Sequence, residues 1–168
     1  LKYACRCDDP VLFMEHKGIY RQGFASSLEP DEDYLLPFGK ARIVQEGNDL
    51  TIVTWGAIVQ KAVEASRNSN KSVEVIDIRT LNPLDMDTIL NSIKKTNRVI
   101  VAHEDHLTAG FGSEISAQIS DVGFEFLDAP VKRIASKDVH VAYSPNLENE
   151  ILVQTSWIEK EIEEIINY

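Results

Sequence analysis

The fold is decided by the stretch VIVAHEDHLTAGFGSEISAQISDV, residues 99–122. It starts with four apolar residues, becomes polar at residues 103–106, and turns at Gly110-Phe111-Gly112. Apolar residues then recur at helical spacing, at Phe111, Ile115, Ile119 and Val122. Strand, loop and helix in this order form the unit of an α/β sheet. Open α/β sheets meet ligands and partners at the carboxyl ends of their strands, so the loop from His103 to Gly112 is the first candidate for function.

The segments around this unit repeat it. Apolar runs predict further strands at residues 41–45, 50–55, 73–78 and 131–135. Amphipathic helices are predicted after Gly56, after an N-cap at Asp85, and from Trp157 onward. This alternation predicts a three-layer α/β/α sandwich with a mostly parallel five-stranded sheet. The turn at residues 46–49 predicts a hairpin of residues 41–50, and with it one antiparallel strand.

The composition limits the partners and the compartment. Hydrophobic residues make up 43% of the chain, enough for a sizeable core. A net charge of -10 and a pI near 4.8 argue against nucleic acid and against an anionic membrane as partners. The acidic surface suits either a basic protein partner or simple solubility. No signal peptide and no membrane-spanning apolar run is visible, and the C-x-C spacing of Cys5 and Cys7 favours free thiols in a reducing compartment.

The residues before the α/β pattern differ from it in composition. Val11-Leu12-Phe13-Met14 is a candidate for a buried strand. Residues 22–38 contain glycine, serine, proline and an acidic patch, which is linker chemistry. We therefore place a linker at residues 22–38, between residues 1–21 and a domain of residues 39–168. The alternative is one long surface loop within a single domain.

The polar run His103-Glu104-Asp105-His106 offers three kinds of chemistry. Four consecutive ligands in a loop rarely converge on one zinc ion, so a metal site is disfavoured. His103 beside a carboxylate suits general acid–base catalysis, but the sequence identifies no second catalytic partner. The favoured interpretation is a loop that is polar because it faces solvent or an interface.

The glycines at positions 110 and 112 have two interpretations. Backbone N–H groups at the start of a helix can bind a phosphate, but a third glycine is missing, since Ile115 stands in its place. The preceding run is acidic and repels phosphate. The favoured interpretation is a tight turn that lets the helix pack close to the sheet, and Trp55-Gly56 has the same two interpretations.

Seven motifs stand in one order along nearly the whole chain. They are VLFMEHKGIYR (11–21), YLLPFGKA (34–41), VTWG (53–56), VIDIRTLNPLD (75–85), HE (103–104), TAGFGSEI (108–115) and FLDAP (126–130). Together they resemble the β chain of thiamine-diphosphate-dependent 2-oxoacid dehydrogenases, of branched-chain or pyruvate type. The resemblance leans slightly to the branched-chain type. Residues 1–21 resemble the tail of the preceding cofactor-binding domain, and residues 39–168 resemble the transketolase C-terminal domain.

The resemblance implies an activity for the whole enzyme. Such enzymes decarboxylate a 2-oxoacid on thiamine diphosphate with Mg²⁺ and reductively acylate a lipoyl group. Their cofactor lies between the α chain and the first domain of the β chain. This chain is therefore expected to bind no cofactor or metal and to be inactive alone. No catalytic residue is expected in it, and His103 and Glu104 are candidates only for the rim of the site.

The resemblance also implies partners, namely an α chain or α domain, a second β chain, and the subunit-binding domain of a lipoyl acyltransferase. His103, Glu104 and Phe111 are candidates for the subunit interface. Asp128 matches a position that pairs with the basic subunit-binding domain, although an ordinary exposed acid is the alternative. The carboxylate of Tyr168 is a weaker candidate, because this tail lacks the proline that the family has.

Two functions of other classes stay open. One is a stand-alone protein-interaction domain without catalysis. The other is a fragment of another transketolase-like enzyme, such as a deoxyxylulose-phosphate synthase, whose substrate calls for a basic residue near the acidic loop. Because the chain begins at Leu1 rather than Met, we expect a fragment. The resemblance places the enzyme in the bacterial cytoplasm or the mitochondrial matrix.

Overall fold

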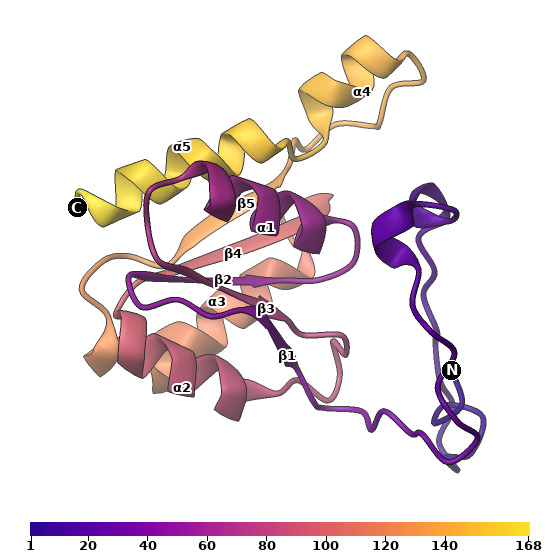
Figure 1. Cartoon of the computed structure of the whole chain (residues 1–168). Coiled ribbons are helices and arrows are strands. Elements are labelled where there is room, and N and C mark those ends of the chain that lie inside the picture. The colour runs from indigo at the N-terminus through magenta and orange to yellow at the C-terminus, as the bar shows by residue number, and fades with distance from the viewer.

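A five-stranded sheet in the order β1-β3-β2-β4-β5 forms the centre of the computed structural model, which describes residues 1–168 (Figure 1). The strands are β1 Arg42–Gln45, β2 Leu50–Thr54, β3 Val73–Asp77, β4 Val99–His106 and β5 Lys132–Ser136. β1 runs antiparallel to β3, and every other neighbouring pair is parallel. The predicted mostly parallel sheet with one antiparallel strand is confirmed.

Helices cover both faces of this sheet, as the alternation of elements predicts (Figure 1). One face carries α1 Ile58–Asn68 and α5 Thr155–Ile166, and the other carries α2 Met86–Thr96 and α3 Phe111–Val122. The remaining elements are α4 Pro145–Ile151 and the 3₁₀ turns η1 Lys17–Ile19, η2 Gly23–Ala25 and η3 Phe124–Phe126. None of the helices combines the length and the hydropathy needed to cross a membrane. The three-layer α/β/α architecture is confirmed.

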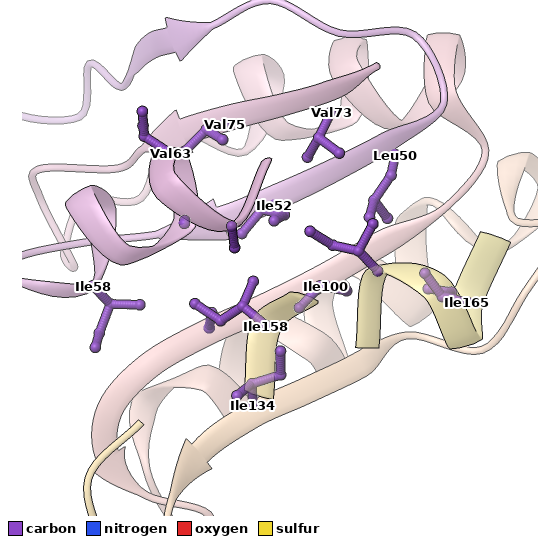
Figure 2. Packing of buried hydrophobic residues seen from close by; sticks show 14 of the residues in the cluster. Leu50, Ile52, Ile58, Val63, Val73, Val75, Ile100, Ile134, Ile158 and Ile165 are labelled. Atoms are coloured by element: carbon purple, nitrogen blue, oxygen red, sulfur yellow. The ribbon is translucent and has the colours of Figure 1, made fainter. Parts of the chain in front are cut away.

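The larger core cluster lies between the sheet and the layer of α1 and α5 (Figure 2). Leu50, Ile52 and Ile100 from the sheet share it with Ile158 and Ile165 from α5, and all five are buried. Burying one such side chain contributes about 1.5–3 kcal/mol. The prediction that the spaced isoleucines of the last helix face the core is therefore confirmed.

α2 begins at an N-cap that also fixes the start of the sheet. The Asp85 carboxylate accepts hydrogen bonds from the Thr88 backbone N–H at 3.2 Å and from the Thr88 hydroxyl at 2.8 Å. It also accepts one from the Ala41 N–H at 2.9 Å, just before β1. Burial raises the pKa of the Asp85 carboxyl, but these hydrogen bonds outweigh burial and the net shift is downward. The predicted N-cap is confirmed.

Two predictions about strands are wrong. β1 does not form a hairpin with β2, because it pairs with β3, with Arg42 opposite Asp77. β2 already has β3 and β4 as its two neighbours, so β1 cannot pair with β2 and pairs instead with the outer edge of β3. Residues 11–14 form no strand and are exposed, Leu12 by 86%. An apolar run becomes a buried strand only beside a pairing strand and under a covering layer, and residues 11–14 have neither.

Residues 1–38 form a segment that we call the strap. It contains no strand and only the turns η1 and η2, and none of its residues is buried. Its internal contacts include Tyr3 edge-on to Phe38, with ring centroids 4.9 Å apart. Figure 1 shows the strap beside the sheet rather than over either helical layer. The domain boundary at residues 22–38 stays a prediction.

Candidate functional site

The polar run after the apolar part of β4 is strand rather than loop. β4 continues through His106, which lies opposite Ser136 of β5 after an irregularity in the pairing. Asp105 and His106 are exposed at its end, and the turn begins only at Leu107. The prediction of a loop from His103 is therefore wrong. Polar side chains at a strand end resemble a loop in sequence, although their backbone still pairs with β5.

His103 is the buried member of this run, with none of its surface exposed. Its ring stacks on Trp55, which follows β2, with centroids 5.2 Å apart and planes 5° from parallel. Trp55 in turn meets the edge of Phe111 at 6.3 Å. Phe111 is half-buried at the first turn of α3. These three side chains join the carboxyl ends of two strands to one helix.

The chemistry of His103 follows from this enclosure. Neither ring nitrogen has a hydrogen-bond partner in the chain. Burial lowers the pKa of the His103 imidazole, the Asp105 carboxylate partly opposes that shift, and the Arg133 guanidinium adds to it. His103 is therefore a neutral ring at pH 7. Its predicted roles at a site rim and at a subunit interface stay predictions.

The two glycines of the turn lie against the His103 ring. A Cβ added at Gly112 would overlap that ring, and one added at Gly110 would overlap the His106 carbonyl first and the ring second. This agrees with the interpretation that the glycines let α3 pack close to the sheet. The space that they leave is filled by the imidazole, and carboxylates of Glu104 and Asp105 precede it. The residues at this helix start therefore do not fit the diphosphate of a thiamine cofactor.

Glu104 is the member of the run that contacts the strap. Its Oε2 lies 2.9 Å from Nε2 of His16 in the strap, and each side chain is about a third exposed. The Glu104 carbonyl also accepts a hydrogen bond from the Ser136 hydroxyl at 2.6 Å. In residues 1–168, no three histidine, cysteine, aspartate or glutamate side chains gather as a set of metal ligands. The roles of Glu104 and Phe111 at a subunit interface stay predictions.

The carboxyl ends of three neighbouring strands form an edge that we call the carboxyl edge. Each of β2, β3 and β4 is followed by a residue with positive φ, namely Gly56 (60°), Arg79 (56°) and Ala109 (61°). Arg79 is held there by its N–H, which donates to Asp77 at 3.1 Å. Burial raises the pKa of the Asp77 carboxyl, although the N–H and the charge of Arg79 oppose that shift. Backbone conformations of this kind cluster at functional sites.

A second candidate site is a groove of about 850 Å³ beside α3, which we call the α3 groove. It is bounded by the outer face of α3, the segment before β5, and the end of the chain. Its lining includes Leu107, Ser113, Ala117, Asp128, Arg133 and Tyr168. Asp128 and Tyr168 are both exposed. The fold thus brings together the two residues that the sequence singled out for partner binding.

Arg133 is a residue of this groove that the sequence analysis missed. Its Nη1 donates to the Leu107 carbonyl at 2.8 Å and to the Ser113 hydroxyl at 2.6 Å. It therefore fixes the turn before α3 from the groove side. An isolated arginine on a short strand carries no sequence signal of this role, because the two acceptors lie 20 or more residues away.

The sequence matches the family model described as transketolase, C-terminal domain, over residues 39–158. The chain belongs to this family. A solved structure, described as a split gene transketolase in an inactive beta4 tetramer, shows the same fold as this transketolase C-terminal domain. Its TM-score is 0.68 at 23% identity, over 82% of this chain and 44% of that chain.

Curated relatives of this transketolase C-terminal domain are pyruvate dehydrogenase E1 β subunits. The mitochondrial subunit of Dictyostelium discoideum is 44% identical over 159 residues, which are 92% of this chain and 45% of the relative. The subunit of Rickettsia felis is 38% identical over 170 residues, 98% of this chain and 51% of the relative. The chain thus spans about half the length of the curated relatives it matches.

Proposed function

We propose that the chain is the carboxyl-terminal part of the β subunit of a pyruvate dehydrogenase E1 component. The whole enzyme would decarboxylate the 2-oxoacid on thiamine diphosphate with Mg²⁺ and acylate a lipoyl group. Pyruvate is favoured over a branched-chain 2-oxoacid, because the relatives described above are pyruvate enzymes. This part would serve subunit assembly and docking to the lipoyl acyltransferase core.

The observation that carries the docking role is the meeting of Asp128 and Tyr168 in the α3 groove. The two positions are 40 residues apart in sequence, since Asp128 lies in the loop before β5 and Tyr168 follows α5 at the end of the chain. Asp128 matches a family position, and the Tyr168 carboxylate is the weaker candidate because its tail departs from the family. Their placement in one groove supports a single docking surface.

Charge supports the same partner. The chain has 27 acidic residues against 17 lysines and arginines, and Asp128 adds an exposed carboxylate to the groove. A basic subunit-binding domain is attracted to such a surface, and charge pairs of this kind steer association and set specificity. A groove of this size with partly apolar walls also gives room for a side chain from the partner.

The carboxyl edge is the face that we propose for the other subunits. It carries Glu104 and is bordered by Phe111, and the strap reaches it through His16. An α chain and a second β chain are the partners that the family resemblance suggests. Because the turn before α3 does not fit a diphosphate, we propose that the chain alone neither binds the cofactor nor decarboxylates. The compartment would be reducing, either mitochondrial or bacterial cytoplasmic.

Calorimetry with a recombinant subunit-binding domain of a lipoyl acyltransferase tests the docking role. The chain is compared with Asp128→Asn at low and at moderate salt. Loss of this carboxylate is expected to weaken binding by about 2–5 kcal/mol if the pair is desolvated, and to flatten the salt dependence.

The matched control is Asp33→Asn, which removes the same charge from the exposed strap. It is expected to leave both affinity and salt dependence unchanged. Unchanged binding in Asp128→Asn would remove Asp128 from the interface, and equal losses in both variants would mean that net charge alone attracts the domain.

A further inference from the structure

The turn from Leu107 to Ser113 separates the His103 ring from the α3 groove. On its inner side the His103 ring fills the space beside Gly110 and Gly112. On its outer side Leu107 and Ser113 line the α3 groove. One segment of backbone therefore rests on the ring and bounds the groove at the same time.

The His103 ring is held by packing alone. It stacks on Trp55 and has no hydrogen bond at either nitrogen. A neutral imidazole tolerates this enclosure, but a charged one would be buried without a hydrogen-bonded partner. The contacts from the end of β2 and from α3, Trp55 and Gly112, are uncharged.

Two charged groups act on the ring from other directions. Arg133 on β5 opposes a positive charge at His103, and it is the residue that fixes Leu107 and Ser113 by hydrogen bonds. Asp105, on the same strand as His103, favours a positive charge. The Asp105 side chain is 61% exposed, so water screens its effect. The ring, the turn and the groove are thus linked through Arg133 as well as through the glycines.

We propose that His103 is a positioning residue for the α3 groove, and that its uncharged, stacked ring holds the turn in the shape that the partner binds. This inference rests on the proposed docking function. Protonation favours a state in which the ring reaches water, and the turn that rests on it moves as well. Acid should therefore weaken binding in the groove although His103 does not touch the partner.

The sign follows from linkage. Burial lowers the pKa of His103 in the folded chain below the ordinary value near 6.5. The opened form then binds more protons than the closed form, so the closed turn loses stability as the pH falls below about 6.5. Above that pH the ring is neutral in both forms and contributes no pH dependence.

The first experiment measures binding of the subunit-binding domain at pH 7.5 and pH 5.0. It compares the unaltered chain with His103→Phe, which keeps a stacking ring, and His103→Asn, which is smaller. Neither replacement titrates. The unaltered chain should lose several-fold more affinity on acidification than either variant, because only the unaltered chain carries a ring at position 103 that takes up a proton. The same probe is used throughout, so its own titration cancels in this comparison.

The second experiment needs no partner. Amide hydrogen-exchange protection of residues 107–113 is measured at both pH values, with thermal melting as the check that each variant is folded. Protection of this turn should fall in acid in the unaltered chain and stay constant in the variants. Equal acid losses in all three proteins would overturn the role of His103. If the domain does not bind at pH 7.5, the docking proposal fails, and the exchange result alone decides whether His103 positions the turn.

Discussion

The strap and the α/β body that follows it, residues 39–168, contain similar apolar side chains with opposite fates. All 39 buried residues of the chain lie in the body, whereas Leu12, Met14 and Leu28 of the strap are between 77% and 95% exposed. The body alternates strands and helices that cover one another, whereas the strap contains neither a strand nor an α-helix. The difference teaches that apolar residues make a core only when secondary structure arranges them in layers.

The strongest test of this contrast compares one deletion of side-chain volume in each region. Ile100→Ala in β4 should lower the free energy of unfolding by about 2–5 kcal/mol, because a fully buried side chain leaves a cavity. Leu12→Ala in the strap should change it by less than about 0.5 kcal/mol. Urea unfolding of both variants gives the two values, and similar losses would mean that the strap is part of the cooperative core.

An addition of volume gives a smaller contrast. Gly112→Ala places a methyl group against the His103 ring, which Trp55 keeps from moving away. The clash should exceed the gain in helix propensity and cost about 1–2 kcal/mol net. Gly23→Ala is the control, since nothing lies within 4 Å of the added Cβ in the strap. A melting temperature unchanged in Gly112→Ala would show that the ring is free to shift.

The smallest effect concerns the link between the two regions. Glu104→Ala removes the acceptor for His16, a partly exposed pair worth at most about 1 kcal/mol. Trypsin cleavage after Lys17 and Arg21 should become faster by up to about fivefold, with the stability of the body unchanged. Glu125→Ala, which removes an exposed carboxylate elsewhere, should leave the cleavage rate as it is. Equal rates in both variants would mean that the pair does not hold the strap.

Most of the fold is predictable from short sequence patterns. The N-cap at Asp85 and the spaced isoleucines of α5 gave correct helices, because capping and burial of one helical face act within a few turns. The sequence does not predict which strand pairs with β1. An edge strand pairs with whichever strand the rest of the sheet leaves with an unpaired edge, and that depends on the whole fold. The end of β4 was misread because its polar side chains hide a backbone that still pairs.

The candidate sites divide in the same way. Sequence motifs pointed to His103 and Asp128 as single positions, but not to what surrounds them. The stacking of His103 on Trp55 depends on the register of β2 and β4, which places the residues after Thr54 and Ala102 side by side. The hydrogen bonds of Arg133 join β5 to the turn before α3 and depend on the complete fold. No local sequence pattern predicts such contacts between distant segments.

The reversed direction of β1 decides where the strap enters the body. Because β1 runs against β3, its first residue, Arg42, lies beside Asp77 at the end of β3. A parallel β1 of four residues would begin about 10 Å away, toward the opposite margin of the sheet. One inverted strand therefore delivers the strap to the same margin as Trp55, Arg79 and Glu104. The direction of β1 therefore places the strap, and any segment joined to it, on the side of the domain where the turns with positive φ lie.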